Sequence, residues 1–355
     1  MNENYLNDYK LEQSEGVFTL KNLNTTLGFV RFNENAKIEY IFVNPIFRKK
    51  GLAKKLIQFY QASFQYEKSF LDNYQWRYRS EFNEFEPLVL MIDNQICGHA
   101  GLIPIDLKIN DKKQKAIWFT DFYITPKHRS KGYGKLLTKE WMKICPIQIT
   151  ICNDQSLKVF KKLNWSNNNN FVRRLKFYNY LNIVPIFRKL NESSFIKNEL
   201  QDLKLEELNN KTITKMADLS ERNLIKKSIG IIRDEKWFKW RILDCPYKKD
   251  IYIFNFKENF IVTRIKLKND LKILSIIYSS QPINSSITRL FSKFSKENNI
   301  DYLSYISNEK KIFDFFLPWQ RKLNFACNTE DKSIKNILNK NYDDVQFIDS
   351  DIDYI

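Results

Sequence analysis

The chain has 355 residues, of which 43% are hydrophobic and 15% are aromatic. That length and composition exceed what one small hydrophobic core requires, so we expect two or three domains. Lys and Arg number 58 against 41 Asp and Glu, and the formal net charge of +17 favours anionic partners. Nucleic acid, an anionic membrane face and a phosphate-bearing cofactor all fit that charge. The abundance of Lys, Asn and Ile is also typical of AT-rich coding, which weakens the charge as evidence for any one of them.

Hydropathy and cysteine usage predict a cytoplasmic protein. The first ten residues are polar, and no apolar run approaches the roughly 18 to 20 residues that span a bilayer. The five cysteines are an odd number, widely spread and without a C-x-x-C pair. They predict reduced thiols, and neither a disulfide framework nor a zinc site. We therefore expect no membrane insertion and no metal cofactor.

Apolar periodicity predicts alternating strands and helices in the first half of the chain. Strands are expected over residues 16–22, 26–32, 37–43, 87–92, 95–109, 114–125 and 147–152, with a last pair near 171–184. Helices are expected over residues 50–64, 67–82, 132–143 and 154–163. The polar run 166–170 is predicted to be a loop.

The second half repeats this order of elements. Residues 188–232 are charged and helical in pattern, which is typical of a connector. Beyond them we expect an aromatic helix from 237, strands over 250–256, 260–267, 271–278 and 302–306, and helices over 285–297 and 310–319. Trp76–Arg77 and Trp240–Arg241 fall at matching places before the first strand of each half. These pairs are candidates for lining an acceptor cleft, and core packing is the alternative.

A shorter repeat lies closer to the N-terminus. The segment FVNPIFRKKGLAKKLIQFY at 42–60 aligns without a gap with YITPKHRSKGYGKLLTKEW at 123–141. Internal repetition of this kind predicts one fold used more than once.

A basic, glycine-containing segment lies between a predicted strand and a predicted amphipathic helix. It consists of Arg129, Ser130, Lys131, Gly132, Tyr133 and Gly134. The N–H groups at the start of a helix have no intrahelical partner, and together with the helix dipole they can cradle a phosphate or pyrophosphate. The glycines let the backbone approach such a ligand, and the Arg and Lys side chains supply charge. The alternative is a basic turn that caps a surface helix.

In its context this segment resembles the signature of the GNAT (general N-acetyltransferase) superfamily. That signature is a strand, V/I-x-P, R/Q-x-x-G-x-G/A, a helix, a second strand, Asn-x-x-Ala/Ser and a helix that ends in K-x-G-F. The chain shows ITP at 124–126, RSKGYG at 129–134, NDQS at 153–156 and KLNW at 162–165. The resemblance covers roughly residues 65–185. It implies an α/β (α+β) fold of tandem GNAT-like domains, each with a mixed, mostly antiparallel sheet flanked by helices.

The resemblance implies acetyl-CoA as co-substrate, bound across the strands that end at Ile124 and Cys152, with its pyrophosphate on the loop amides. The implied cofactor-binding residues are Phe122, Tyr123, Ile124, Arg129, Ser130, Lys131, Gly132, Tyr133, Gly134, Asn153, Ser156 and Phe160. In such enzymes the acceptor amine attacks the thioester directly. Catalysis then depends on positioning, amine deprotonation and polarisation of the carbonyl group.

The candidate catalytic residues are Asp121, His99 and Tyr123. Asp121 lies on the central strand, where acidic groups of this family often face the acceptor, and it is the candidate general base. Its alternative is an ion pair with a nearby Lys or Arg. His99 lies in GHAG on the preceding strand and can accept a proton near neutral pH. A structural role is the alternative for His99.

The chain departs from the family pattern at two positions. Phe160 stands where the family frequently has a tyrosine that protonates the leaving thiolate, and a phenyl ring donates no proton. Tyr123, Tyr178 or water would then serve, or the thiolate leaves unaided. Asn164 replaces the glycine of K-x-G-F, and asparagine tolerates the left-handed conformation that this helix end requires.

Four segments are expected along the chain. Residues 1–64 form a truncated GNAT-like unit of three strands and one helix, 65–187 a complete GNAT domain with the acyl-CoA site, 188–232 a helical connector, and 233–355 a degenerate GNAT-like domain. In the last segment SSQPINSS stands where R-x-x-G-x-G would be, so we expect no phosphate site there. The sequence leaves open whether the N-terminal RKKGLA copy binds CoA.

The expected activity is acetyl-CoA-dependent N-acetyl transfer to a small or medium acceptor. Similarity to tandem acetyltransferases associated with bacterial surface polysaccharides implies an amino sugar or polysaccharide precursor. One alternative is an aminoacyl-tRNA-dependent peptidyl transferase of tandem GNAT type, which the charge favours and the intact loop disfavours. Another is a non-catalytic CoA-binding scaffold, which Phe160 favours. The acceptor itself, N- against O-acetylation and the oligomeric state stay open.

Overall fold

A computed structural model describes residues 10–14, 17–22, 25–32, 38–43, 69–78, 80–92, 95–168, 170–178, 203–268, 271–307, 319–340, 342 and 345–349. The chain divides into two compact units. The first unit comprises residues 1–80, 85–102 and 121–141, and the second comprises 81–84, 103–120 and 142–355. The long strands β6 (Gln95–Ile109) and β7 (Lys112–Ile124) contribute residues to both units.

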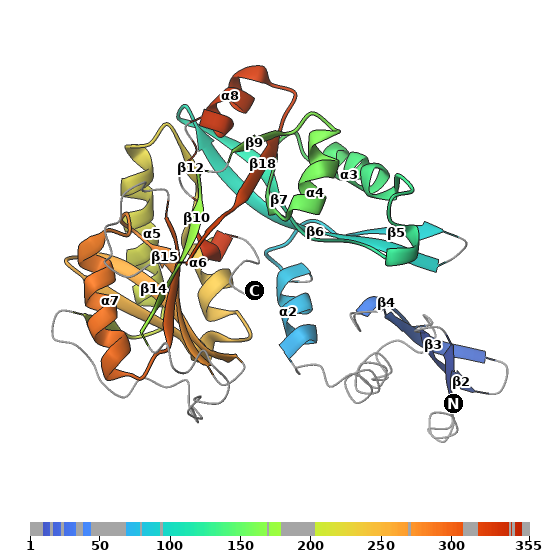
Figure 1. The fold of residues 1–355 in the computed structure, drawn as a ribbon, viewed down its shortest axis with the longest axis horizontal. Coiled ribbons are helices and arrows are strands. Elements are labelled where there is room, and N and C mark those ends of the chain that lie inside the picture. The colour runs from blue at the N-terminus through green and yellow to red at the C-terminus, as the bar shows by residue number, and fades with distance from the viewer. Residues whose placement is uncertain are drawn as a thin grey trace. The chain divides into compact units, whose positions relative to one another are not determined.

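The first unit begins with a four-stranded antiparallel sheet in the order β1-β2-β3-β4 (Figure 1). Its strands are β1 (Lys10–Ser14), β2 (Val17–Asn22), β3 (Thr25–Phe32) and β4 (Ile38–Val43). The three strands predicted from the sequence are confirmed, and β1 is additional. The helix predicted over 50–64 lies outside the described residues.

The rest of the first unit includes the start of β6 and the end of β7. Its elements are α2 (Ser69–Tyr78), β5 (Leu88–Ile92), the 3-10 turn η3 (Pro126–His128) and α3 (Tyr133–Ile144). β5 pairs antiparallel with β6. A Cβ atom at Gly98 would lie 2.7 Å from Cδ1 of Ile124 and 3.3 Å from the carbonyl oxygen of Tyr123. Glycine at this position therefore allows β6 to approach the end of β7 closely.

The central mixed sheet has the order β12-β6-β7-β8-β18-β9. Its remaining strands are β8 (Gln148–Cys152), β9 (Ser166–Asn168), β12 (Ile229–Ile231) and β18 (Asn324–Asn328). β8 runs parallel to β7, and β18 pairs antiparallel with both β8 and β9. A strand from near the C-terminus thus completes the sheet that holds the predicted acyl-CoA segment.

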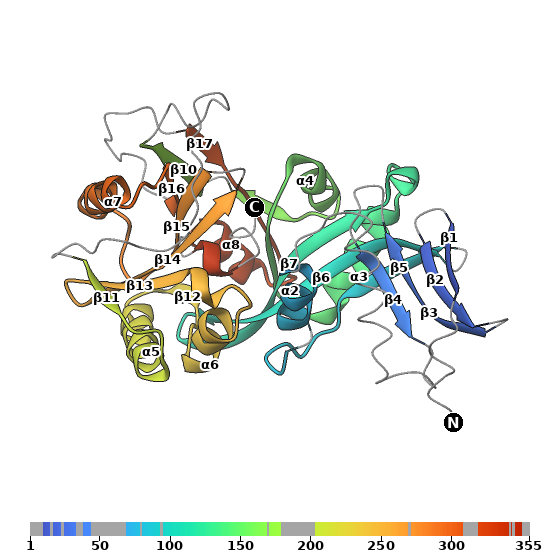
Figure 2. The same cartoon turned by 90° about the horizontal axis from the view of Figure 1, so that it is seen from below.

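A second mixed sheet lies in the second unit in the order β11-β13-β14-β15-β16-β10-β17. Its strands are β10 (Val172–Phe177), β11 (Lys204–Glu206), β13 (Ile251–Phe256), β14 (Asn259–Lys268), β15 (Leu271–Ser279), β16 (Tyr302–Ser307) and β17 (Trp319–Lys322). Only β15 and β16 pair in parallel among these strands. Figure 2 shows helices α5 (Asn210–Ile225) and α7 (Ser285–Glu297) on opposite faces of this sheet. Phe254, Phe291 and Phe294 pack edge to face between sheet and helix α7.

Shorter helical elements complete the second unit. They are α4 (Asp154–Lys161), α6 (Glu235–Phe238), the π-helical turn η6 (Lys239–Leu243), η7 (Lys248–Asp250), α8 (Lys332–Lys340) and the C-terminal 3-10 turn η8 (Phe347–Asp349). Five of the described helices begin after an Asn or Asp whose side chain accepts hydrogen bonds from the first turn: Asn153, Asn209, Asp234, Asn284 and Asp331. None of the described helices combines the length and apolarity needed to cross a bilayer.

These two mixed sheets with flanking helices confirm the predicted α/β (α+β) class, and three details differ from the sequence prediction. Residues 166–168 form β9 instead of a loop, because β18 offers them an edge to pair with. Trp319 begins strand β17 and does not end a helix, while 310–318 lie outside the described residues. The segment 188–232 contributes helix α5 and one strand to each large sheet.

Candidate functional site

The basic loop predicted to hold phosphate connects β7 to α3 through the turn η3. Oγ1 of Thr125 lies 2.8 Å from Nδ1 of His128, and Nε of Arg129 donates to the carbonyl oxygen of Ile124 at 2.9 Å. The guanidinium of Arg129 also lies over the ring of Tyr123, 5.4 Å from its centroid. These contacts hold the start of the loop against the end of β7.

Left-handed backbone conformations give the loop its shape. Ser130 has φ 61° and Gly132 has φ +87°. Arg129, by contrast, has an extended backbone with φ −67° and ψ 159°. A turn that carries left-handed residues can direct successive N–H groups toward one side as an anion-binding nest. Among the described residues other than its chain neighbours, no atom lies within 4 Å of a Cβ built on Gly132, so the space beside Gly132 is open there. Residues 129–132 are exposed, and helix α3 begins at Tyr133.

The predicted catalytic segment lies at an irregular point of β7. Asp121 has φ 48°, a conformation that costs a non-glycine residue roughly 1–3 kcal/mol and persists only where neighbours hold it. Beyond it, Phe122 packs against Trp141 of α3 with ring centroids 5.1 Å apart, and Ile124 is buried. Asp121, the strained residue, therefore lies close to Ile124, where β7 ends and the basic loop follows.

The carboxylate of Asp121 is bound by two residues of α2. Nη1 of Arg77 donates to Oδ2 at 3.0 Å, and the hydroxyl of Tyr78 donates to the same oxygen at 2.5 Å. The side chain of Asp121 is 41% exposed, whereas that of Arg77 is 7% exposed. The ion pair considered as the alternative for Asp121 is thus present, and the carboxylate still reaches the surface.

His99 contacts the backbone of the same strained residue. Its Nδ1 lies 3.1 Å from the carbonyl oxygen of Asp121, and since a carbonyl only accepts, Nδ1 carries the proton. Its Nε2 is buried. Burial lowers the pKa of His99, opposed by the charge of Asp121 and by the hydrogen bond to its backbone. The imidazole is therefore neutral at pH 7 and donates to the strained turn of β7.

Sequence reasoning missed Tyr78. Its hydroxyl binds Asp121, and its ring meets the ring of His99 edge-on at 6.1 Å. The available signal was its place directly after the Trp76–Arg77 pair on a predicted aromatic helix. Both residues of that pair are buried, as are Trp240 and Arg241, which agrees with the packing alternative.

The second half of the sequence signature lies in the second unit. Oδ1 of Asn153 accepts from the amide of Ser156 at 2.8 Å and caps α4. Phe160 is buried and stacks on Trp165 with centroids 4.6 Å apart. Asn164 has φ 60°, which confirms the left-handed helix end expected there.

The remaining candidates for proton transfer differ in their burial and in their contacts. The hydroxyl of Tyr123 is buried under the loop, and the hydroxyl of Tyr178 lies 3.3 Å from Oγ of Ser292 on α7. Burial raises the pKa of the Cys152 thiol, at the end of β8, to about 12, which leaves it protonated and inert at neutral pH. Among the described residues no cluster of three or more His, Cys, Asp or Glu is placed to hold a metal.

Two protein-family models match parts of the chain. Residues 59–165 match the model of the "Acetyltransferase (GNAT) family", and residues 1–71 match that of an "Acetyltransferase (GNAT) domain". The chain therefore carries GNAT acetyltransferase domains. It is by that assignment an enzyme of the acyltransferase class.

One solved structure shows a similar fold over about three quarters of the chain, and two more were matched below that level of similarity. N-myristoyltransferase of Saccharomyces cerevisiae with bound myristoyl-CoA aligns with TM-score 0.50 and 14% identity over 74% of each chain. A GCN5-related N-acetyltransferase of Anabaena variabilis aligns with TM-score 0.48 and 13% identity over 79% of this chain and 70% of that one. A probable N-acyltransferase of Enterococcus faecalis aligns with TM-score 0.48 and 12% identity over the same shares. A search of curated protein sequences found no significant match.

Proposed function

We propose that this protein transfers the acetyl group of acetyl-CoA to an amine of a small or medium acceptor, such as an amino sugar or a polysaccharide precursor. The observation that carries the proposal is the exposed loop 129–132, with its two left-handed residues, directly before α3. The family matches and the fold supply the class of reaction. The sugar acceptor rests on the sequence resemblance alone.

The loop meets the physical requirements of a pyrophosphate cradle. Among the described residues it is open beside Gly132, its two left-handed residues allow a nest of N–H groups, and the N-terminal dipole of α3 adds a favourable field. Arg129 and Lys131 place two exposed cations beside it. We assign Arg129 to Gly134 to the diphosphate. The assignment of Asn153, Ser156 and Phe160 to donor binding rests on the sequence resemblance alone.

We assign acceptance of the amine proton to Asp121. Its carboxylate is the exposed member of the group, while Nε2 of His99 and the hydroxyl of Tyr123 are buried. Arg77 and Tyr78 both bind its Oδ2 and so fix the direction of the carboxylate. His99 acts as a positioning residue, because its Nδ1–H binds the carbonyl of the strained turn.

The leaving thiolate is protonated by water in this proposal. Phe160 carries no proton to donate, and the hydroxyl of Tyr123 is buried. The modest basicity of a thiolate lets it leave without a positioned acid. The reaction is complete when the C–N bond has formed, the C–S bond has broken and the amine proton has passed through Asp121 to solvent.

The first experiment is calorimetric titration of acetyl-CoA and of free CoA into the wild type and Gly132→Trp. Tryptophan at Gly132 fills the open space over the nest, so we expect micromolar binding by the wild type and none by the variant. Lys139→Trp is the matched control, because Lys139 is exposed on the same helix beyond its first turn. Binding by Gly132→Trp equal to that of Lys139→Trp would remove the loop from the donor site.

A turnover assay separates the enzyme from its alternatives. Release of free CoA thiol is measured with a panel of amino sugars and with simple amines, and we expect release with at least one amine. Binding without turnover across the panel would favour the non-catalytic CoA-binding protein. No CoA binding, together with RNase-sensitive association with tRNA, would favour the aminoacyl-tRNA-dependent transferase.

A further inference from the structure

Two arginines lie side by side on neighbouring strands of the second mixed sheet. The strands β16, β10 and β17 follow one another in that order, and β17 is the last strand of the sheet (Figure 2). In the antiparallel register of β10 and β17, Arg173 is directly opposite Arg321. Residues in this relation point to the same face, with Cβ atoms about 4.5–5.5 Å apart. Two positive charges are therefore held together on one face of the sheet.

Neither arginine has a carboxylate partner in the part of the chain that the structure describes. Nε of Arg173 donates to Oγ of Ser304 on β16 at 3.2 Å, and its guanidinium lies 5.6 Å from the ring centroid of Phe347. Arg321 is exposed. Like charges directly opposite each other destabilise a sheet. Folding alone gives no reason for this pair, whereas an anion bound between the two guanidinium groups would.

The position of Arg173 disfavours its charge as long as no anion is bound. Burial lowers the pKa of Arg173, Tyr302 raises it and the charge of Arg321 lowers it. A guanidinium nevertheless stays protonated at neutral pH. The carboxylate of Asp301, the chain neighbour of Tyr302, is buried and accepts from the backbone amide of Lys272 at 2.7 Å. An anion at Arg173 would replace the solvation that burial has removed.

A phenol lies on the same face as the two arginines. Tyr302 and Ser304 are two residues apart on β16, so their side chains point to one face of the sheet. The hydrogen bond between Ser304 and Arg173 shows that this is the face of the arginine pair. Burial raises the pKa of Tyr302, and the charge of Arg173 opposes this effect. The hydroxyl of Tyr302 is therefore protonated at neutral pH and able to donate to an anion.

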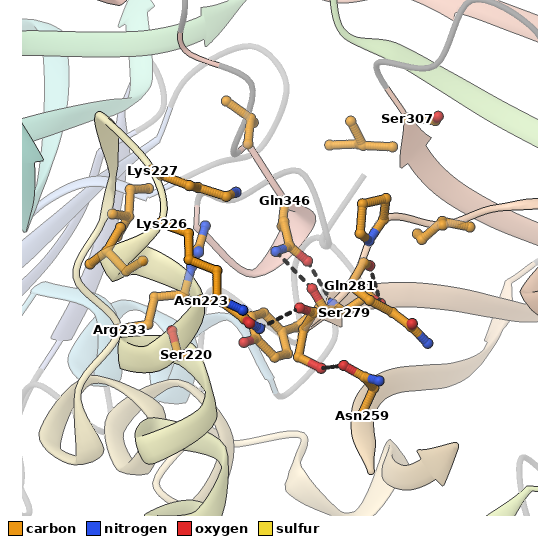
Figure 3. A pocket seen from close by; sticks show the side chains of 18 of the residues that line it. Ser220, Asn223, Lys226, Lys227, Arg233, Asn259, Ser279, Gln281, Ser307 and Gln346 are labelled. Carbon is orange, nitrogen blue, oxygen red and sulfur yellow. Dashed lines mark hydrogen bonds between the residues drawn. The ribbon is translucent and has the colours of Figure 1, made fainter. Parts of the chain in front are cut away.

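The aromatic ring beside Arg173 is fixed by the C-terminal turn η8. Phe347 is buried in this turn. Figure 3 shows its chain neighbour Gln346 bound to Ser279 of β15: the amide of Ser279 donates to Oε1 at 2.6 Å, and Nε2 donates to the carbonyl oxygen of Ser279 at 3.2 Å. Arg173 thus lies between a fixed ring and the hydroxyl of Ser304. A guanidinium held in place loses less entropy when it binds an anion.

The charges and donors of this face fit a phosphate group better than a carboxylate. A phosphate monoester carries a charge of about −1.5 to −2 at neutral pH and has three acceptor oxygens. Its charge matches two guanidinium groups, and its oxygens can accept from both of them and from a hydroxyl at once. A carboxylate has a single charge and two oxygens in one plane, which one guanidinium fork satisfies.

We propose that Arg173 and Arg321 bind the phosphate group of a small phosphate monoester, with the hydroxyl of Tyr302 as a third donor. All three residues belong to the second unit, whereas the loop proposed for acetyl-CoA belongs to the first. The two sites can therefore be tested independently of each other.

The test compares four probes by NMR titration into the full chain, at about pH 7.5 in a buffer without phosphate. The probes are phenyl phosphate, inorganic phosphate, benzenesulfonate and benzoate. We expect phenyl phosphate to bind, and the two monoanions to bind at least about tenfold more weakly because each carries one charge. Phenyl phosphate should also bind more tightly than inorganic phosphate. The reverse order would replace the proposed monoester by free phosphate, and equal binding of benzoate and phenyl phosphate would contradict the phosphate site.

Variants locate the binding. Arg321→Gln should weaken binding of phenyl phosphate at least about tenfold, and it should not lower the thermal midpoint without ligand, because it removes a contact between like charges. Arg173→Lys keeps the charge without the fork and should also weaken binding. Lys322→Gln is the matched control, since Lys322 is exposed and follows Arg321 on the same strand, on the other face of the sheet.

Two further results decide the location of the site. Gly132→Trp should bind phenyl phosphate as the wild type does, whatever its effect on acetyl-CoA, and loss of binding in this variant would place the phosphate at the loop instead. No binding of phenyl phosphate by the wild type, or equal affinities of Arg321→Gln and Lys322→Gln, would overturn the proposal.

Discussion

The second unit should be sensitive to the loss of either partner of the buried pair formed by Arg233 and Asp349. Both hydrogen bonds are short, and the two side chains are 3% and 0% exposed. Oδ2 of Asp349 also accepts from the amide of Gln346 at 2.8 Å. The guanidinium lies 5.9 Å from the ring centroid of Trp237 and 5.7 Å from that of Tyr278. Asp349 thereby fastens the C-terminal turn η8 to the core.

Asp349→Ala leaves a guanidinium buried without its carboxylate. Removal of one partner of a buried pair costs about 3–5 kcal/mol, so the urea midpoint of the second unit should fall steeply. Intrinsic tryptophan fluorescence, to which Trp237 beside Arg233 contributes, and far-UV circular dichroism follow the transition. Two probes are needed because a chain with two compact units need not unfold in one step.

Two further variants test whether the loss of stability comes from the unpaired buried charge. Asp244→Ala breaks the pair of Lys239 and Asp244, whose side chains are 52% and 46% exposed, and should cost about 0–1 kcal/mol. Arg233→Met/Asp349→Leu replaces the buried pair by apolar groups and should recover most of the loss. A loss for Asp349→Ala no larger than that for Asp244→Ala would refute the reasoning.

Gly98→Ala should destabilise the first unit by about 1–3 kcal/mol, because its Cβ would lie 2.7 Å from Ile124, and a midpoint equal to wild type in thermal unfolding would contradict this. Tyr78→Phe removes one donor from Asp121 and should lower kcat about tenfold with the dissociation constant of acetyl-CoA unchanged; an unchanged kcat would remove Tyr78 from the positioning of Asp121. Burial lowers the pKa of His99 below 6.5, so the unfolded chain takes up this proton at a higher pH than the folded one. Stability should therefore fall as pH drops below about 6.5, and less so in His99→Gln, as thermal midpoints between pH 7.5 and 5.5 would show.

The loop after β7 and the loop after β15 differ in how their polar groups are bound. After β7 the chain keeps glycine and basic residues, and the space beside Gly132 is open among the described residues. After β15 the loop polar groups are bound by Gln346 and Asn223, and Asn284 caps the helix that follows. That the C-terminal segment lacks a phosphate site stays a prediction for the loop after β15, where the family's R-x-x-G-x-G would lie.

The sequence by itself determined the local elements and the loop. Strand alternation located β2 to β7, and the helix predicted over 285–297 has those bounds in the structure. The nest around Gly132, the cap by Asn153 and the left-handed Asn164 could be predicted because each depends on residues close in the chain.

Only the tertiary structure decided which distant segments meet. β18 enters the central sheet beside β8, β10 joins the second sheet beside β16, and η8 brings Asp349 to Arg233. Tyr78 reaches Asp121 in the same way. Alternation of apolar residues shows that a strand has one buried face. The same alternation would be seen whichever free sheet edge the strand joined, so it does not identify the neighbouring strand. The partners of these strands and side chains are set by which edges and buried charges remain unpaired once the local elements have packed.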